Sequence, residues 1–365
     1  MRGHVVVVGA GIIGASIAYY LTRLGIAVTV VEKGVPAAGA TSHSFGWINA
    51  NTPDDADYFR LRLASLLEYR VLEAGLHQPL PLRWGGSLNW QGEWEMLARE
   101  ATTLRGFGYP VEVLCRAEIM AMEPALADVP AFCHHAPLEG ALNPALAATM
   151  LLAAARENGA RLILGAEVTA FATMNGRMSG VRTSAGTVGA ERIVLATGVR
   201  TQALLADIGM DLPMDNRPGV ILRTRPVAPI LNHIVLAPGL HVRQEVDGTL
   251  LAGEDFVGGE GTDDPTGAAA EVLVRLQRLL PGVAGLEVGQ VTAGTRPIPA
   301  DGLPAIGWLD TEETLYVATM HSGVTLAPIV GRLASLEIAG RPAEEMLAGY
   351  RPVRLARAKG SGKSA

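Results

Sequence analysis

The first 32 residues combine two mainly apolar runs with one helical pattern. Four consecutive valines, residues 5–8, are typical of a strand buried on both faces of a parallel sheet. Apolar positions recur at helical spacing over residues 15–24, and Gly25 follows as a typical helix end. Residues 27–31 form a second apolar run, which closes with Glu32. The pattern predicts a strand, a helix and a second strand parallel to the first.

Helical and strand patterns continue to mix along the chain, which indicates the α/β class (α+β overall). We expect further helices at residues 58–74, 144–158, 268–280 and 326–339, and further strands at residues 161–168, 193–197 and 315–319. Turn pairs separate shorter strand-like runs, so antiparallel hairpins are expected around Asn175-Gly176, Ala185-Gly186 and Asp247-Gly248.

Two segments indicate a second domain. Residues 79–137 hold three of the five tryptophans, several prolines and short apolar runs, and residues 217–254 are rich in strand patterns. At about 150 residues per domain, the 365-residue chain has room for two domains. The end of the chain, residues 359–365, consists of small and basic residues and is predicted to be a disordered tail.

Composition and charge exclude several classes of protein. The chain is 49% hydrophobic and 18% charged, which is ordinary for a soluble globular protein. A net charge of −6 argues against binding to nucleic acid or to an anionic membrane. No stretch offers the roughly 18 apolar residues of a membrane span, and the N-terminal residues lack the pattern of a signal peptide. We therefore expect a cytoplasmic protein.

Metal and disulfide chemistry is not expected. Cys115 and Cys133 have neither the number nor the spacing of a disulfide framework or a zinc site, so reduced thiols are expected. His134 and His135 are adjacent and would point to opposite faces of a strand, which prevents them from sharing an ion. We predict no metal site.

The most informative motif joins the first predicted strand to the first helix. Gly9, Gly11 and Gly14 form the pattern Gly-x-Gly-x-x-Gly, and Glu32 follows 18 residues after the last glycine. Glycine permits a tight turn, a close approach of the backbone to a pyrophosphate, and close packing of the helix on the strand. The helix N-terminus would bind the phosphates, and Glu32 would accept hydrogen bonds from the ribose hydroxyls. We expect a dinucleotide site, and the acid disfavours the 2′-phosphate of NADP.

The segment after Glu32 favours FAD over NAD. NAD dehydrogenases usually continue here into further strand and helix units, whereas residues 39–46 are small and polar and end beside Trp47. Such a segment can lie along an extended dinucleotide and reach an isoalloxazine ring. We therefore expect FAD as the cofactor.

With these residues, the chain resembles the D-amino-acid oxidase-like superfamily of FAD amine oxidoreductases, which includes glycine oxidase, sarcosine oxidase and D-amino-acid dehydrogenase. The resemblance covers nearly the whole chain, and its landmarks occur in order. Besides the glycine motif with Glu32, they are residues 39–46, Leu142-Asn143-Pro144, Ala196-Thr197-Gly198, residues 293–297, Asp301-Gly302, Pro304 and residues 320–323.

The resemblance implies a two-domain fold. A Rossmann-type FAD-binding domain would combine the separate segments 1–79, 141–215 and 291–358. A substrate domain would combine residues 80–140 and 216–290 around a mixed, mainly antiparallel sheet. These two segments correspond to those that the residue pattern sets apart.

The resemblance also implies which residues contact the FAD. Val168 would meet the adenine through its backbone, and the loop before the last helix would meet the pyrimidine end of the flavin. The expected cofactor-binding residues are Gly9, Gly11, Ile12, Ile13, Gly14, Glu32, Lys33, Thr41, Ser42, His43, Gly46, Val168, Ala196, Thr197, Gly198, Gly323, Val324, Thr325 and Leu326. We expect non-covalent FAD; the alternative is a covalent link through His43, as in some dimethylglycine dehydrogenase-like members.

Arg296 and His321 are the candidates for the catalytic site. Arg296 stands where glycine oxidase-like members carry a substrate-side arginine, and a guanidinium binds a carboxylate in bidentate fashion. Glycine oxidase-like members have a second arginine near position 321, whereas this chain has histidine, which argues against a two-arginine clamp and against glycine. His321 could orient the amine or accept its proton near neutral pH. The alternatives are a structural ion pair for Arg296 and a packed, hydrogen-bonded histidine.

Two further residues are candidates for substrate binding. Arg243 lies in an alternating strand and would either face the substrate cavity or be solvated, the second being favoured. Trp47 would either wall the pocket or pack in the core.

The sequence therefore predicts an FAD-dependent oxidoreductase that oxidises the C–N bond of a primary or secondary amino acid to an imine by hydride transfer to the flavin. The expected partner is a small amino-acid substrate, with a partner subunit or a homo-oligomer left open. The alternative function is an FAD-carrying subunit of a heteromeric amino-acid or opine-type dehydrogenase, whose partner supplies electron transfer. Aromatic hydroxylation on a related fold is less favoured, because no second Gly-x-Gly-x-x-Gly motif is present.

Overall fold

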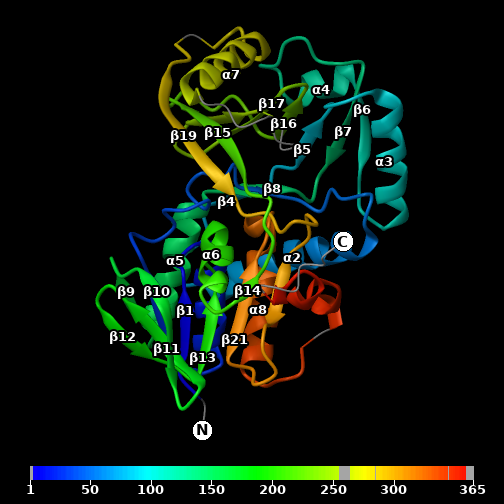
Figure 1. The fold of residues 1–365 in the computed structure, drawn as a ribbon. Coiled ribbons are helices and arrows are strands. Elements are labelled where there is room, and N and C mark those ends of the chain that lie inside the picture. Colours follow the sequence, from blue (N-terminus) through cyan, green and yellow to red (C-terminus); the bar gives the residue numbers. More distant parts are fainter. Residues whose placement is uncertain (1–2, 255–263, 284, 344, 359–365) are drawn as a thin grey trace, which may run out of the picture.

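The computed structural model describes residues 3–254, 264–283, 285–343 and 345–358. The tail predicted at residues 359–365 lies outside these ranges. Two large sheets dominate the structure, and Figure 1 shows one above the other, each with its own helices. No helix in the described ranges is both long and apolar enough to cross a bilayer.

The lower sheet has six strands and carries the motif at the start of the chain. Five strands are parallel, and only the edge strand β20 is antiparallel to its neighbour. In spatial order they are β20 (Ala305–Trp308), β21 (Leu315–Thr319), β13 (Arg192–Leu195), β1 (Val5–Val8), β2 (Val28–Glu32) and β9 (Arg161–Leu164).

Both faces of this sheet are covered, which explains the unbroken valine run of β1. Val5 and Val7 pack into a core with four helices, and Val6 and Val8 pack on the opposite face against a three-stranded meander. The helices are α1 (Ile12–Arg23), α2 (Ala56–Gly75), α5 (Pro144–Glu157) and α8 (Gly323–Ile338). The meander consists of β10 (Val168–Met174), β11 (Arg177–Thr183) and β12 (Gly186–Gly189).

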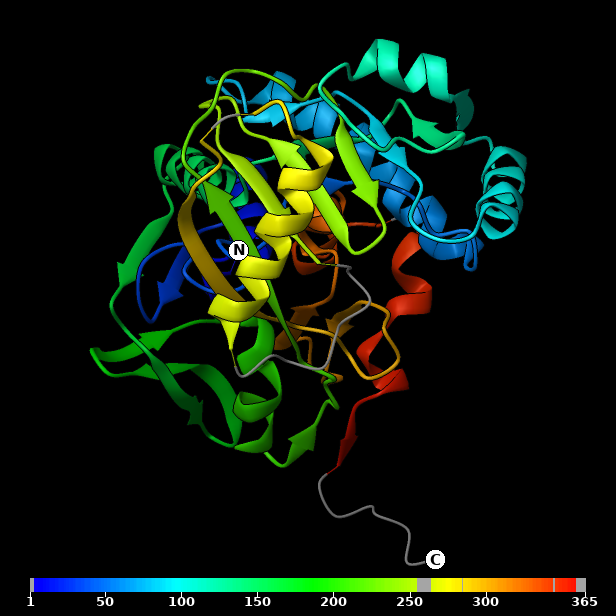
Figure 2. The ribbon, with the colours of Figure 1, turned by 90° about the horizontal axis from the view of Figure 1, so that it is seen from above.

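The upper sheet has eight strands and is antiparallel except where β16 runs parallel to β5. The strands in spatial order are β19 (Val288–Arg296), β15 (Arg217–Thr224), β18 (Leu250–Gly253), β17 (Leu240–Gln244), β16 (Ile234–Ala237), β5 (Ser87–Asn89), β7 (Phe132–Ala136) and β6 (Glu112–Cys115). Its helices are α3 (Trp94–Gly106), α4 (Arg116–Met122) and α7 (Pro265–Leu279). Figure 2 shows α7 lying across the strands.

The two faces of the upper sheet follow the two-residue period of a strand. Leu222 and Val242 point toward α7 and form one core with it. Ile221 and Leu236 point the other way, toward the lower sheet, and pack with Phe45. The second face therefore becomes one wall of the space between the two sheets.

Smaller elements complete the fold. Short strands β3 (Trp47–Ile48), β8 (Gly140–Leu142) and β4 (Leu82–Arg83) form a three-stranded sheet, and β14 (Met210–Asp211) pairs with β22 (Arg357–Ala358). The remaining elements are α6 (Thr201–Ala206) and 3-10 helices at Gly198–Arg200, Glu345–Tyr350 and Pro352–Arg354.

The structure confirms the predicted fold class, with a Rossmann-like parallel sheet and a mixed, mainly antiparallel second sheet. The single strand expected at residues 161–168 was wrong, because Gly165 adopts a φ of +70° and the chain turns there from β9 into the meander. The helices expected from residues 15 and 326 begin three residues earlier, at Ile12 and Gly323. The proposed domain boundaries stay a prediction.

Helices α1 and α8 approach each other closely through small residues. A Cβ added at Gly331 would lie 2.2 Å from Ser16 Oγ, which donates a hydrogen bond to the carbonyl oxygen of Ala327 at 2.7 Å. We expect Gly331→Ala to lower the free energy of unfolding by about 1–3 kcal/mol, because the helices must separate. Thermal unfolding measures the change.

The matched control is Gly106→Ala in the last turn of α3. A Cβ added at Gly106 meets nothing within 4 Å, so this variant should be neutral or slightly stabilised, as alanine favours a helix more than glycine does. Equal melting temperatures for the two variants would contradict the close packing of α1 on α8.

Candidate active site

A cleft of about 1030 Å³ lies between the two sheets. On the lower side it is lined by residues that end or follow the parallel strands: Gly9, Glu32, Ala196 and Met320. On the upper side it is lined by residues of the second sheet, among them Ile221, Leu236 and His241. The carboxyl ends of parallel strands are where α/β sheets bind their ligands.

The glycine turn has the geometry that the motif predicts. Gly9 has a φ of +101°, and a Cβ there would lie 2.5 Å from the carbonyl oxygen of Ala196. A Cβ on Gly14 would lie 2.0 Å from the carbonyl oxygen of Gly9, so this glycine serves the packing of α1 on β1. Gly11, Ile12 and Ile13 line the cleft at the start of α1, where the helix dipole is positive.

Glu32 is held at the cleft by two backbone hydrogen bonds. Its Oε2 accepts from the Ala10 N–H at 2.9 Å, and its Oε1 accepts from the Gly34 N–H at 3.0 Å. Each carboxylate oxygen has capacity for a further hydrogen bond, such as one from a ribose hydroxyl. Lys33 lines the cleft beside it.

The segment at residues 39–46 lies along the same cleft. Thr41 Oγ1 accepts a hydrogen bond from the Ile12 N–H at 3.0 Å, which fixes the segment to the start of α1. His43 lines the cleft, and its Nδ1 lies 2.9 Å from the carbonyl oxygen of Gly39. A Cβ on Gly294 would lie 2.3 Å from His43 Cβ, so strand β19 passes directly over this segment.

The other end of the cleft contains His321 and the start of α8. Ser322 caps the helix in a left-handed conformation, with a φ of +55°, and residues Gly323, Val324 and Thr325 line the cleft. Burial is the largest of the effects that lower the pKa of His321 to about 4, and the nearby guanidinium groups of Arg62 and Arg296 contribute to the same shift. A pKa of about 4 corresponds to an uncharged imidazole at pH 7, and the role of His321 toward an amine stays a prediction.

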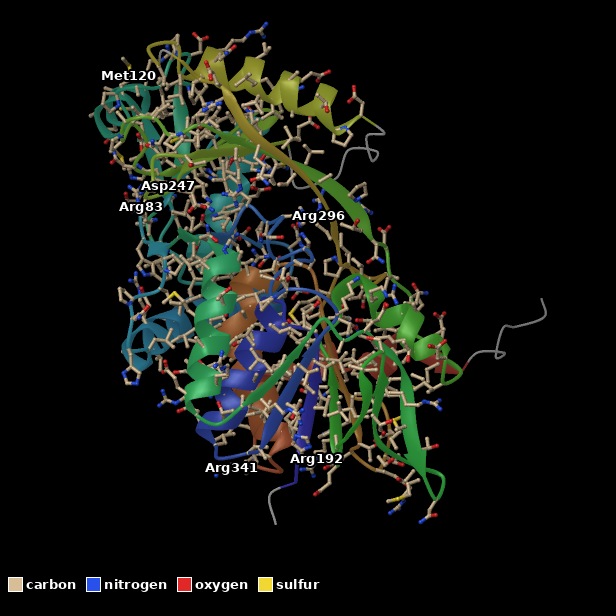
Figure 3. All side chains as sticks on the ribbon, turned by 90° about the vertical axis from the view of Figure 1, so that its left-hand side faces the viewer. Arg83, Met120, Arg192, Asp247, Arg296 and Arg341 are labelled. Atoms are coloured by element: carbon tan, nitrogen blue, oxygen red, sulfur yellow. The ribbon has the colours of Figure 1, made fainter. Side chains whose placement is uncertain are left out.

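Arg296 ends strand β19 and lines the cleft from the side of the upper sheet. Figure 3 places it between the upper and lower parts of the molecule. Its Nη2 donates a hydrogen bond to the carbonyl oxygen of Pro218 at 2.9 Å, on the neighbouring strand β15. This contact holds the guanidinium at the cleft.

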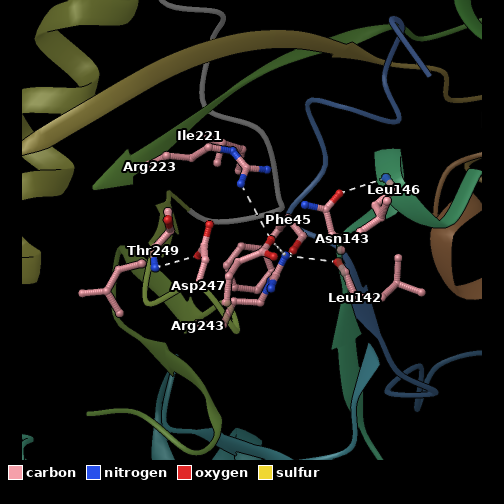
Figure 4. Close-up of polar contacts among 12 residues, drawn as sticks. Phe45, Leu142, Asn143, Leu146, Ile221, Arg223, Arg243, Asp247 and Thr249 are labelled. Atoms are coloured by element: carbon pink, nitrogen blue, oxygen red, sulfur yellow. Dashed lines mark hydrogen bonds and ion pairs between the residues drawn. The ribbon is translucent and has the colours of Figure 1, made fainter. Parts of the chain in front are cut away.

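Arg243 has a different place from either of its predicted ones. It is 4% exposed and does not line the cleft, so it is neither solvated nor directed at a substrate. Its guanidinium donates to the carbonyl oxygens of Phe45 and Leu142 and pairs with Glu245 at 2.9 Å (Figure 4). Arg243 therefore connects the upper sheet to the segment that lies along the cleft.

Trp47 lines the cleft and is held from behind by a buried carboxyl group. Its Nε1 donates to Glu139 Oε2 at 2.8 Å, and the Tyr109 hydroxyl donates to Glu139 Oε1 at 3.0 Å. Burial raises the pKa of Glu139 to about 7, although hydrogen bonds from Ser87, Trp47 and Tyr109 oppose the shift. Trp47 thus forms a fixed part of the wall.

The structure brings most of the predicted site residues to one cleft. The lining includes Gly9, Gly11, Ile12, Ile13, Glu32, Lys33, Thr41, His43, Gly46, Trp47, Ala196, Thr197, Gly198, Arg296, His321, Gly323, Val324 and Thr325. Five predicted residues do not line it: Gly14, Ser42, Val168, Leu326 and Arg243. Roles for individual residues stay predictions.

Two residues that line the cleft were missed by the sequence interpretation. Arg62 lies on α2 and is 7% exposed, and His241 lies on β17 against the ring of Phe45, with ring centroids 4.5 Å apart. The available signal for Arg62 was its position on the buried stripe of α2, between Tyr58 and Ser65. A charged residue on such a stripe indicates a buried polar site.

Three features define the class: a parallel sheet of the dinucleotide-binding type, a turn that requires glycine at Gly9, and Glu32, held by two backbone N–H groups. Together they are typical of an oxidoreductase that uses a flavin or nicotinamide dinucleotide. The chain matches the family of FAD dependent oxidoreductases over residues 4–335 and belongs to it. It is thus an FAD-dependent oxidoreductase, as the resemblance implied.

Individual relatives have the same fold. The chain is 31% identical over 355 residues to the glycine oxidase of Geobacillus kaustophilus (strain HTA426), covering 92% of each chain. The crystal structure of glycine oxidase from Geobacillus kaustophilus superimposes with a TM-score of 0.88 at 28% identity, covering 97% of this chain and 99% of the other. The iminodiacetate oxidase from Chelativorans sp. BNC1 superimposes with a TM-score of 0.83 at 25% identity, covering 95% and 98%.

The residues of the cleft fit FAD. A Cβ at Gly9 or Gly11 would meet Ala196 or Thr41, so glycine keeps the turn tight at the start of α1, where a pyrophosphate would bind. Glu32 is held at the end of the cleft next to the glycine turn, and the start of α8 lines the other end. These positions would hold the ribose and the pyrimidine ring, respectively.

The raised pKa of Glu139 gives a prediction for stability. Its pKa in the folded protein, about 7, exceeds the ordinary value of 4.5, so the folded state binds this proton more tightly than the unfolded chain. The carboxyl group therefore contributes stability at low pH that is lost as the pH rises from about 4.5 through 7. Glu139→Gln removes this loss, so its stability relative to the parent protein should increase between about pH 5 and pH 8.

Denaturant unfolding at several pH values measures this difference. The control is Glu157→Gln, because Glu157 is exposed at the end of α5. If the Glu139→Gln and Glu157→Gln profiles run parallel to that of the parent protein, the carboxyl group is ionised at neutral pH and the assignment is wrong.

Proposed function

We propose that this chain oxidises the C–N bond of a primary or secondary amino acid to an imine. The observation that carries the proposal is the position of Arg296 and His321 on the same cleft as the start of α8. When bound, FAD would accept the hydride that leaves the carbon next to nitrogen. The named relatives, glycine oxidase and iminodiacetate oxidase, act on compounds that carry both an amine and a carboxylate, which supports this substrate class.

Arg296 would bind the substrate carboxylate. Its guanidinium reaches the cleft from β19, and the hydrogen bond to the carbonyl oxygen of Pro218 restricts its orientation. A planar guanidinium can hold a carboxylate with two parallel hydrogen bonds, which fixes the direction of the C–N bond as well as its position.

His321 would contact the amine as a neutral acceptor. A pKa of about 4 keeps the imidazole uncharged at neutral pH, so it does not repel an ammonium group and can accept a hydrogen bond from it. Its Nδ1 lies 3.2 Å from Ser322 Oγ, which restricts the ring. The uncharged amine is the form that can be oxidised, and burial in the cleft favours the uncharged amine over the ammonium.

The start of α8 would stabilise negative charge at the pyrimidine end of the flavin. Gly323, Val324 and Thr325 line the cleft, and backbone N–H groups in the first turn of a helix point away from it along the axis. Such groups and the helix dipole favour an anion at this position.

The alternative is that the chain is an FAD-carrying subunit of a heteromeric dehydrogenase. The comparisons give no support to it. Oxygen consumption separates the two: an oxidase forms peroxide alone, whereas a subunit of this kind is active only with an artificial acceptor or a copurified partner. Aromatic hydroxylation would require consumption of NAD(P)H.

The proposed reaction can be tested by anaerobic reduction of the flavin. The holoenzyme is mixed with D-, L- and N-substituted amino acids, and the flavin absorbance should bleach with at least one of them. If none of these compounds bleaches the flavin while dithionite does, the proposed amino-acid oxidation is wrong.

Replacement of Arg296 tests its contact with the carboxylate. We expect Arg296→Ala to weaken substrate binding by about 2–5 kcal/mol, so that KM rises by a factor of at least about 30 while flavin content stays unchanged. The matched control is Arg217→Ala, because Arg217 lies opposite Arg296 on the neighbouring strand β15 but does not line the cleft. Similar KM values for all three proteins would assign Arg296 a structural role.

A further inference from the structure

Arg62 is a buried cation at the cleft that the proposed reaction does not use. It is 7% exposed and lines the cleft from helix α2, in the lower part of the molecule. Its Nε donates to the carbonyl oxygen of Asn49 at 3.0 Å, its Nη2 donates to Asn49 Oδ1, and its Nη1 donates to Ser322 Oγ at 3.2 Å. These three contacts use three of the five N–H donors and fix the plane of the guanidinium.

Within the part of the chain that the structure describes, no anion pairs with this guanidinium. Within the described ranges, no carboxylate lies within ion-pair distance of Arg62, and its hydrogen-bond acceptors are all uncharged. Glu139 is near enough for its pKa to respond to Arg62, but that carboxyl group is hydrogen-bonded to Trp47 and Tyr109. A buried cation is costly unless an anion compensates it, so the missing negative charge points to a ligand.

The neighbours of Arg62 at the cleft are polar. Asn49, Asn51 and Tyr58 line the cleft with it, and the guanidinium lies over the Tyr58 ring at 5.3 Å from the centroid. This part of the cleft therefore suits a charged oxygen group rather than an apolar side chain.

Two cations approach His321 from opposite walls. Arg62 belongs to α2 under the cleft, and Arg296 belongs to β19 above it, and both lower the pKa of His321. An amino acid with one carboxylate needs only one of them. With the amine at His321, a ligand that reaches both guanidinium groups would carry a carboxylate at either end.

We propose that Arg62 forms a second carboxylate subsite, so that the preferred substrates are amino dicarboxylates. This inference rests on the proposed amino-acid oxidation, because only that reaction would make a bound dicarboxylate a substrate. The binding of a dicarboxylate to Arg62 does not itself depend on turnover. One carboxylate binds Arg296, the nitrogen lies beside His321, and the second carboxylate binds the two remaining donors of Arg62.

Equilibrium binding of non-oxidisable acids to the holoenzyme tests the subsite without turnover. Succinate and butyrate have the same chain length and differ in the second carboxylate, and both are titrated against the flavin absorbance. We expect succinate to bind at least about tenfold more tightly than butyrate, the value of one charge-assisted hydrogen bond. Equal dissociation constants in the parent protein would overturn the proposal before any variant is made.

The variants locate the effect. Arg62→Gln should remove the preference for succinate and leave butyrate binding within about twofold, whereas Arg62→Lys should retain part of it. The matched control is Arg60→Gln, because Arg60 is exposed on the same helix and pairs with Asp57. Arg60→Gln should bind both acids as the parent protein does. If Arg62→Gln does not retain FAD, the result with Arg62→Lys decides.

A second arm distinguishes the substrate from the cofactor as the source of the anion. If Arg62 compensates charge on the flavin instead, Arg62→Gln lowers the reduction potential and weakens the binding of succinate and butyrate equally, which would overturn the proposal. Turnover is then compared for iminodiacetate and N-ethylglycine, two secondary amines that differ in one carboxylate. Bleaching by neither compound nor by any amino acid contradicts the proposed oxidation, while a succinate preference that depends on Arg62 would still stand.

Discussion

The close approach of helix α1 to strands β1 and β13 is the constraint on which the rest of the structure depends. It exists because Gly9 and Gly14 carry no Cβ: a side chain at either position would collide with the backbone of Ala196 or of Gly9. The same approach directs the start of α1 into the cleft and places Ala10 within hydrogen-bond distance of Glu32. One steric condition therefore determines how the helix packs on the sheet and where a dinucleotide can bind.

The fold could be predicted from the sequence wherever the local pattern and the tertiary packing require the same structure. The valine run of β1, the apolar run of β21 and the helix after Asn143 are such cases. The exception at residues 161–168 has a physical cause. Gly165 lies inside a run whose composition continues to resemble a strand, but its left-handed backbone directs the chain into another sheet, and periodicity does not record that turn.

The site was predictable at its cofactor end and much less so at its substrate end. The glycine turn and Glu32 belong to one strand-helix-strand unit, so a motif can describe them. Arg62, His321 and Arg296 come from α2, the residues before α8, and β19, and only the packing of those elements brings them to one cleft. Arg243 is a further example. The alternation along β17 predicts on which face of the sheet its side chain lies, but not that the carbonyl oxygens of Phe45 and Leu142 hold it there.

The two walls of the cleft come from different sheets, and strand β19 contributes Arg296 to the upper wall. It runs along the edge of the upper sheet for nine residues and delivers Arg296 opposite the parts of the lower sheet that would hold the dinucleotide. Substitutions on the upper wall would thus change the selectivity of the proposed site for one acid over another, while the glycine turn at the lower sheet keeps its geometry.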